Sequence, residues 1–195
     1  AENGYEYYIM YTTNAQKAYL DTLSIIMKGM LKDYISKNSV AGVAVIKLAD
    51  VENIVDEYMA QESTITILAN LEAQYTIPKE QFAGIYSQTI TPILSAYINM
   101  MASDKENPSA FLVSDAVDTM VDAIVSQEQV VQGASSIASA MTEANMNKII
   151  LGKVGELSLK LMQTMGNSFK VDEKKIASAF KFNLDEDELK RLFQT

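Results

Sequence analysis

The stretch NAQKAYLDTLSIIMKGMLKDYISK, residues 14–37, decides the fold. Its larger apolar side chains recur at intervals of three and four residues, which is the spacing of one face of an α-helix. These side chains are Leu20, Leu23, Met27, Met30 and Tyr34. A coiled coil between chains and a helix of an intramolecular bundle both show such a seam. Because the seam covers only two heptads, we expect a bundle helix.

Further segments on the C-terminal side of this helix show the same spacing. Pro78 and Pro108 suit the first turn of a helix, whereas Pro92 should kink or split the helix that contains it. The expected helices cover residues 49–75, 78–103, 108–132 and 147–165, with a short helix of small residues around 137–141. The side chains expected on the buried side of the 108–132 helix are Val113, Val117, Met120, Val121, Ile124 and Val125.

Three segments keep more than one interpretation. Residues 40–48 are apolar with Gly42 among them, and they fit a buried turn, a strand or a helix start. The tyrosine-dense residues 5–11 fit either a helix or a strand that docks on the core. Residues 133–136, Gly-Ala-Ser-Ser, fit a loop or a site where another backbone approaches closely.

The last thirty residues contain the only internal echo that the sequence shows. Two Asp residues thirteen positions apart, Asp172 and Asp185, each follow an apolar residue and precede another one four positions further on. This is the pattern of an N-cap with a hydrophobic staple, so each copy predicts a short helix. We therefore expect a helical bundle over residues 1–168 and a pair of short capped helices over 169–195. Periods of 30 to 45 residues, typical of solenoids, do not occur.

The composition supports this architecture. Hydrophobic residues make up 48% of the 195 residues, enough for a core, and only three prolines and eight glycines interrupt the chain. Few helix breakers and many good helix formers favour helix. The predicted fold class is all-α, an elongated multi-helix bundle with two short C-terminal helices.

Composition also excludes several functions. The chain has no cysteine and no histidine, which removes thiol chemistry, Ser-His-Asp triads and imidazole acid–base catalysis. The net charge is −9 and Arg191 is the single arginine, so binding to nucleic acid or to anionic lipid is not expected. No run of 18 apolar residues occurs, so the sequence predicts no membrane-spanning helix.

Two acidic groups are the candidates for metal binding. Asp115, Asp118 and Asp122 share one side of an expected helix, where three carboxylates could bind a divalent cation. A solvated acidic stripe explains them as well, and a ferritin-like site would also need histidine. The run 185–188, Asp-Glu-Asp-Glu, lacks the register of a calcium loop and suits an acidic first helical turn. We expect no catalytic, cofactor or metal site, no cofactor and no enzymatic activity.

The segment FKVDEKKIASAFKFNLDEDEL, residues 169–189, resembles part of a known class. Together with Met165-Gly166, it is similar to the extracytoplasmic regions of FtsX-like ABC-transporter permeases of Firmicutes. The resemblance implies an extracytoplasmic domain of a protein attached to the cell membrane. Its partners would be the remainder of the permease and an ATPase subunit on another chain. No functional residue of that family maps onto these positions.

The predicted function is therefore a non-enzymatic extracytoplasmic helical domain of an ABC-transporter permease that mediates contact with a partner or a substrate. A protein or peptide is the partner expected for such a domain. The alternative is a stand-alone secreted helical protein that acts by interaction or on membranes, as effectors and pore-formers do. An enzyme that uses a metal bound by Asp115, Asp118 and Asp122 is a third hypothesis.

Overall fold

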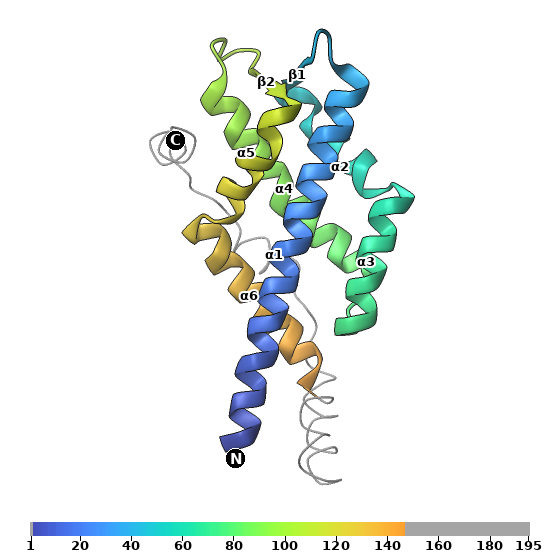
Figure 1. Cartoon of the computed structure of the whole chain (residues 1–195), viewed down its shortest axis with the longest axis vertical. Coiled ribbons are helices and arrows are strands. Elements are labelled where there is room, and N and C mark those ends of the chain that lie inside the picture. The colour runs from blue at the N-terminus through green and yellow to red at the C-terminus, as the bar shows by residue number, and fades with distance from the viewer. Residues whose placement is uncertain (1, 147–195) are drawn as a thin grey trace.

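The computed structural model describes residues 2–146, which form a mainly α-helical fold as predicted (Figure 1). The helix expected over residues 147–165 and the pair of capped helices in 169–195 lie outside the described residues. In chain order the elements are α1 (Glu2–Asn38), β1 (Val43–Lys47), the 3₁₀ helix η1 (Leu48–Asp50), α2 (Val51–Met59), α3 (Glu62–Tyr75), α4 (Lys79–Met101), β2 (Ser109–Val113), the 3₁₀ helix η2 (Ser114–Ala116), α5 (Val117–Val125) and α6 (Glu128–Ala144).

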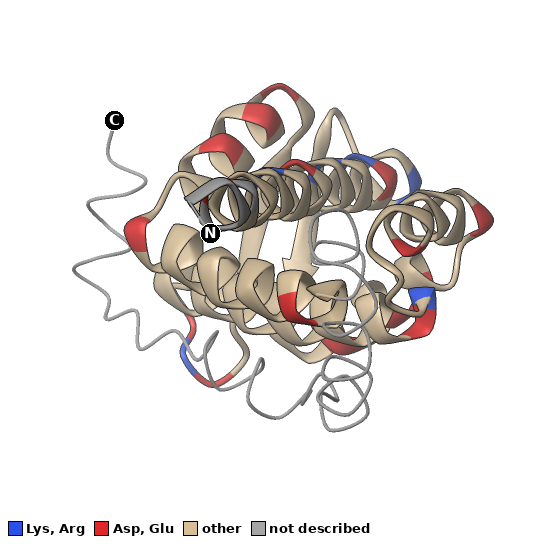
Figure 2. Ribbon diagram, turned by 90° about the horizontal axis from the view of Figure 1, so that it is seen from below, with Lys and Arg blue, Asp and Glu red and all other residues tan. Residues whose placement is uncertain are grey.

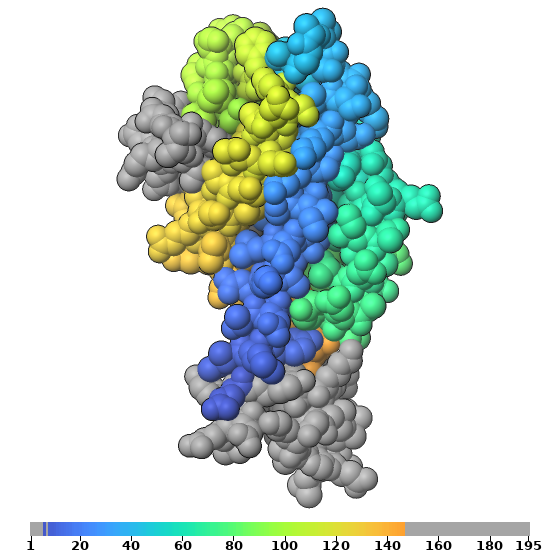
Figure 3. All heavy atoms as spheres, viewed as in Figure 1, coloured from blue at the N-terminus to red at the C-terminus, as the bar shows by residue number. Residues whose placement is uncertain are grey.

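The helix α1 runs the length of the described part and organises it. It packs against α5 and α6 on one side and against α2 and α3 on the other (Figure 3). Residues 5–11 lie in its first turns, so the helical alternative holds for that segment. The predicted seam is the buried face of α1, because Leu23, Met27 and Met30 are fully or almost fully buried. The intramolecular bundle is therefore confirmed.

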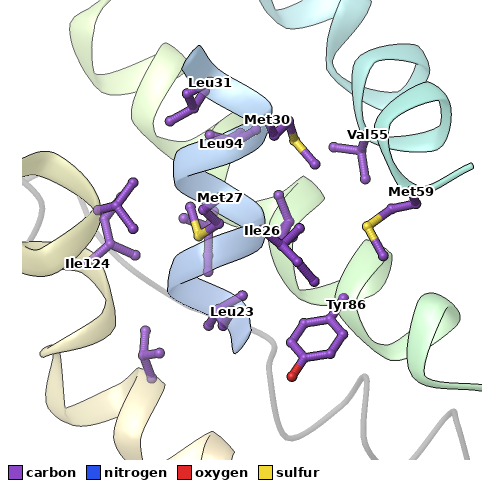
Figure 4. Close-up of a cluster of buried hydrophobic side chains, with 14 of the residues drawn as sticks. Leu23, Ile26, Met27, Met30, Leu31, Val55, Met59, Tyr86, Leu94 and Ile124 are labelled. Atoms are coloured by element: carbon purple, nitrogen blue, oxygen red, sulfur yellow. The ribbon is translucent and has the colours of Figure 1, made fainter. Parts of the chain in front are cut away.

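The core is built around this face of α1. Figure 4 shows Leu23, Met27 and Met30 surrounded by side chains from three other helices. These side chains are Val55 and Met59 of α2, Tyr86 and Leu94 of α4, and Ile124 of α5. Each fully buried apolar side chain stabilises the fold by about 1.5–3 kcal/mol relative to exposure. The contacts that α1 makes with these helices are therefore a substantial source of stability.

The helix α4 continues through Pro92 as one element from Lys79 to Met101. The expected split does not occur. A proline inside a helix removes one backbone hydrogen bond and crowds the preceding turn. Here buried residues flank Pro92 on both sides and keep the two halves of the helix packed on the same core. They are Ile90 before it and Ile93 and Leu94 after it. Tertiary packing thus outweighs the local preference.

The strands β1 and β2 pair antiparallel, with Val45 opposite Phe111. For residues 40–48 this selects the strand among the three interpretations. The helix predicted from Pro108 is wrong at its beginning, because residues 109–113 form β2 and helix begins only at Ser114. Residues Ser-Ala-Phe-Leu-Val also fit the alternation of a strand, and pairing with β1 supplies the hydrogen bonds that select the extended form.

Burial in the 108–132 segment follows from this change. Val117, Met120, Val121 and Ile124 are buried, as predicted, and Val125 is half-buried. Val113 was expected in the core, but it points outward from β2 and is 43% exposed. The helix also ends at Val125, and α6 begins at Glu128. Residues 133–136 lie inside α6 and do not form a loop.

The described chain contains an internal repeat that the sequence did not reveal. The order helix, strand, 3₁₀ helix, helix, helix occurs twice, as α1–β1–η1–α2–α3 and as α4–β2–η2–α5–α6. The boundaries of β1, η1 and α2 recur 66 residues later in β2, η2 and α5. Backbone angles recur as well: φ and ψ are −67° and 145° at Gln61, and −62° and 138° at Gln127. We call the two copies the first and second repeat.

A twofold relation connects the two repeats. Val45 pairs with Phe111, the residue at the equivalent position of the second repeat. A shift of 66 residues also converts the pair Val43 and Val113 into the pair Ser109 and Lys47. The local twofold axis of the strand pair therefore passes through Val45 and Phe111. The long helix of each repeat packs on the short helices of the other repeat, α1 on α5 and α6, and α4 on α2 and α3. Both repeats thus contribute to one shared core.

Candidate functional site

The three aspartates predicted as candidate metal ligands lie on the surface beside α1. Lys28 Nζ lies 2.8 Å from Asp122 Oδ1, and Lys32 Nζ lies 2.8 Å from Asp118 Oδ1. Asp115 lies in η2 and is exposed. Within residues 2–146 no three carboxylates come close enough together to hold a metal ion. Asp118 and Asp122 therefore connect α5 to α1 through ion pairs, and their lysine partners were not predicted.

The ion pairs involve a large share of the basic residues of the described part. Lys and Arg positions concentrate on α1, whereas Asp and Glu positions occur on most helices (Figure 2). The Lys32 ammonium holds the pKa of the Asp118 carboxyl below its usual value, and the Asp122 carboxylate raises the pKa of Lys28. Both pairs are exposed to solvent, which screens their attraction, so each contributes little to stability.

Tyr19 and Tyr86 form the most deeply buried polar cluster of the described residues. Tyr86 Oη donates to the Tyr19 carbonyl oxygen at 3.0 Å, and Tyr19 Oη lies 3.1 Å from Thr89 Oγ1. Burial raises the pKa of both hydroxyls well above their usual value. Since both side chains are shut off from solvent and hydrogen-bonded, they act as structural groups.

The outer face of the β1–β2 pair is the first candidate site. Val43, Val45, Phe111 and Val113 point away from the core, and Val40 stands beside them in the preceding turn. Phe111 is 71% exposed and Val40 80% exposed. We call these five residues the ribbon face. Large apolar side chains gathered in this way on a soluble surface mark a contact region more often than chance exposure does.

The ribbon face lies at one end of the described part. In Figure 1 the two strands are at the top, whereas the N-terminus of α1 and the C-terminal end of α6 lie toward the bottom. The turn that leads into β1 contains Ala41 and Gly42 with φ of 54° and 81°. Left-handed backbone of this kind suits Gly42, and it turns the chain so that Val40 stands on the outside. The ribbon face is thus presented away from the two ends of the described chain.

The second candidate site is a pocket between the C-terminal part of α1 and α2. Its volume is about 290 Å³, near the lower end of the range for ligand pockets. The lining residues are Met30, Asp33, Tyr34, Lys37, Asn38, Asp50, Asn53, Ile54, Glu57, Tyr58 and Gln61. We call this the α1–α2 pocket. Three carboxylates and one ammonium line it, so the pocket is acidic.

Hydrogen bonds hold one side of the α1–α2 pocket in place. Asp33 Oδ2 accepts from Lys37 Nζ at 3.0 Å and from Gln61 Nε2 at 3.3 Å. Tyr34 Oη donates to the Val45 carbonyl oxygen at 2.6 Å, which connects the pocket to the edge of β1. Burial and the Asp50 carboxylate raise the pKa of Tyr34. Asp50 and Glu57 have no ion-pair partner among the described residues.

Neither candidate site was predicted from the sequence. The alternation Val43, Val45 and Phe111, Val113 would have pointed to the ribbon face only once both segments were known to be strands. Comparison of the chain with profiles of known protein families, with curated proteins and with solved structures found no match. Within residues 2–146, no helix combines the length and the apolar character needed to cross a membrane. The function of the chain therefore has to be inferred from its geometry and its charge.

Proposed function

We propose that the chain is a non-enzymatic interaction domain that binds a protein partner through the ribbon face. The observation that carries this proposal is the exposure of five large apolar side chains, four on the strand pair and Val40 in the turn before it. The opposite face of the same strands holds Ala44, Ile46 and Leu112 in the core. The outer apolar residues are therefore not required to close the fold, and their contact with water is a cost that a bound partner would relieve.

The size of the ribbon face indicates what kind of partner fits. The exposed fractions of the five side chains correspond to an apolar area on the order of 400 Å². A stable interface between two globular proteins takes about 800 Å² from each partner. The ribbon face thus fits a short apolar segment, such as one side of an amphipathic helix, better than a second copy of this chain.

The resemblance of residues 169–189 to FtsX-like ABC-transporter permeases gives this domain a setting. In that setting it is an extracytoplasmic part of a permease attached to the cell membrane, with ATP hydrolysis on a separate subunit. The ribbon face lies at the end remote from the N-terminus of α1 and from the C-terminal end of α6 (Figure 1).

Photo-crosslinking in the native host tests the interaction. A photoreactive residue replaces Phe111 in one variant and Ile25 in a control, because Ile25 is an apolar residue of α1 that is 55% exposed outside the ribbon face. We expect one discrete protein adduct from position 111 and none from position 25. A synthetic peptide that spans the cross-linked segment should bind the purified chain saturably, and Phe111→Ser should abolish that binding.

Three results would contradict the interaction proposal: adducts with lipid alone, adducts with a second copy alone, or equal adducts from both positions. The permease setting has a separate test. The parent gene should encode membrane-spanning segments on both sides of this region. A free-standing reading frame that stops directly after the region would remove the permease setting and leave the ribbon face as the site of a secreted interaction protein.

A further inference from the structure

The α1–α2 pocket occurs at positions where the two repeats differ most in chemistry. The long helices α1 and α4 match with a shift of 67 residues, which aligns Tyr19 with Tyr86 and the buried Leu23 with Ile90. Under these shifts the three carboxylates and the two tyrosines of the pocket correspond to apolar residues, whereas Asn53 and Gln61 have polar equivalents, Thr119 and Gln127. The corresponding pairs are Asp33 and Met100, Tyr34 and Met101, Asp50 and Ala116, Glu57 and Ala123, and Tyr58 and Ile124.

This difference separates residues that the fold needs from residues that it does not need. Positions that hold the core keep their character, as Val51 and Val117 or Val55 and Val121 do. The second repeat forms the same elements with the same backbone angles although it has none of the three pocket carboxylates. The unit can therefore form without carboxylates at these three positions. Asp33 is held by Lys37 and Gln61, whereas Asp50 and Glu57 have no ion-pair partner among the described residues and are free for another role.

We propose that the α1–α2 pocket binds an organic ammonium cation, either a free alkyl amine or the side chain of a lysine. The pocket has three carboxylates against the single ammonium of Lys37, so its charge favours a cation. Its aromatic residues, Tyr34 and Tyr58, offer ring surface that attracts such a cation. Asn38, Asn53 and Gln61 add oxygen acceptors for the N–H groups.

The geometry favours an organic cation over a metal ion. A metal ion needs several oxygen ligands within about 2.0–2.6 Å, and no three carboxylates in the described residues converge in that way. The volume of about 290 Å³ exceeds what a bare ion fills and accommodates an alkyl chain with a charged end. The apolar side chains of Met30 and Ile54 in the lining give such a chain contact area.

Calorimetric titration of the full chain tests the proposal with two probes. One probe is 1,5-diaminopentane and the other is a tripeptide, acetyl-Gly-Lys-Gly-amide, and the neutral 1,5-pentanediol is the reference. We expect saturable binding of at least one charged probe and none of the diol. Saturation by the diamine identifies a free amine as a sufficient ligand, whereas saturation by the tripeptide alone identifies the source as a protein chain.

Matched substitutions locate the binding. Asp50→Asn and Glu57→Gln each remove one charge from the pocket, and we expect each to weaken binding about tenfold or more. Asp56→Asn removes the same charge from α2 outside the pocket lining and should leave binding unchanged. Phe111→Ser should also leave it unchanged, which separates this proposal from the role of the ribbon face. Equal weakening by Asp56→Asn, equal binding of the diol, or no saturable binding of either probe would overturn the proposal.

Discussion

The rings of Tyr19 and Tyr86 stack in the centre of the fold, with centroids 4.7 Å apart and planes inclined by 10°. The two tyrosines occupy equivalent positions in α1 and α4, and each is followed three residues later by a threonine, Thr22 or Thr89. The Tyr19 hydroxyl hydrogen-bonds to Thr89 of the other helix. Burial raises the pKa of Tyr19 and of Tyr86, and Thr89 and Thr22 respectively offset part of the rise. The contact between the repeats is thus reciprocal at its centre.

The buried tyrosine pair should make the protein sensitive to alkali. Burial raises the pKa of Tyr19 and Tyr86 above the usual value of 10.0, so the folded state keeps both protons after the unfolded chain has lost them. This contribution to stability is complete below about pH 10 and decreases as the pH rises further, by about 1.4 kcal/mol per pH unit for each tyrosine. Urea unfolding at several pH values above 10 measures the slope.

A phenylalanine variant provides the comparison. Tyr86→Phe removes one buried titrating group and should reduce the alkaline slope by up to about 1.4 kcal/mol per pH unit. Stability at neutral pH should fall by about 1 kcal/mol through the lost hydrogen bond. Tyr34→Phe, at the rim of the α1–α2 pocket, should reduce the slope less, because Tyr34 is only partly buried. An alkaline slope that Tyr86→Phe leaves unchanged would show that other groups control the transition.

Gly29 of α1 lies directly against the hydroxyl end of Tyr58. A Cβ atom at position 29 would overlap Tyr58 Oη and would lie 3.1 Å from Cζ of the same ring. Alanine gains up to about 1 kcal/mol in helix propensity over glycine, but a clash of this kind costs about 1–3 kcal/mol. We therefore expect Gly29→Ala to lower the free energy of unfolding, as measured in urea.

The double variant tests whether Tyr58 is the cause. Tyr58→Phe removes the hydroxyl that the new methyl group would meet, so the combination with Gly29→Ala should recover most of the lost stability. In the second repeat, Ala96 stands in place of Gly29 and Ile124 in place of Tyr58. The methyl group of alanine thus occurs there together with a side chain that has no hydroxyl. A double variant no more stable than Gly29→Ala alone would place the strain elsewhere.

The ion pairs between α1 and α5 predict a weak response to acid. Because Lys32 lowers the pKa of Asp118, the pair stabilises the fold above the ordinary aspartate pKa and loses this effect as the pH falls below it. Asp118→Asn should lower Tm slightly at neutral pH, and its difference from the parent chain should disappear by about pH 3. The charge exchange Lys32→Asp with Asp118→Lys should restore Tm at neutral pH, and failure to do so would show that the pair contributes nothing.

Helical periodicity predicted the part of the fold in which packing and local preference agree. The seam of Leu23, Met27 and Met30 predicted α1 correctly, because the apolar stripe of a long amphipathic helix is stable only when it faces the core. The same reasoning found the extent of α4. It also predicted helix over residues 49–75, but as one helix, whereas the structure has two, α2 and α3, separated at Ala60 and Gln61. At Pro92 it predicted a kink or a split, and the split does not occur, because the surrounding core keeps both halves of α4 together.

The features that were missed depend on pairs of distant residues. The strand β2 forms because residues 43–47 lie beside it, and a periodicity confined to residues 109–113 cannot show this. The repeat escaped notice because identical pairs such as Val51 and Val117 are scattered among pairs that share only apolar character, as Leu23 and Ile90 do. Lys28 and Lys32 reach Asp122 and Asp118 only because α1 packs on α5, so the acidic stripe alone could not reveal its partners.

The two faces of β2 should respond oppositely to truncation. Phe111 points outward and is 71% exposed, whereas its neighbour Leu112 points inward and is 3% exposed. Leu112→Ala leaves a cavity in the core and should cost about 2–5 kcal/mol, whereas Phe111→Ser should change the free energy of unfolding by less than about 0.5 kcal/mol. Urea unfolding of both variants measures the contrast. If Phe111→Ser destabilised the chain as much as Leu112→Ala, Phe111 would be a core residue, and the ribbon face would not be free to bind a partner.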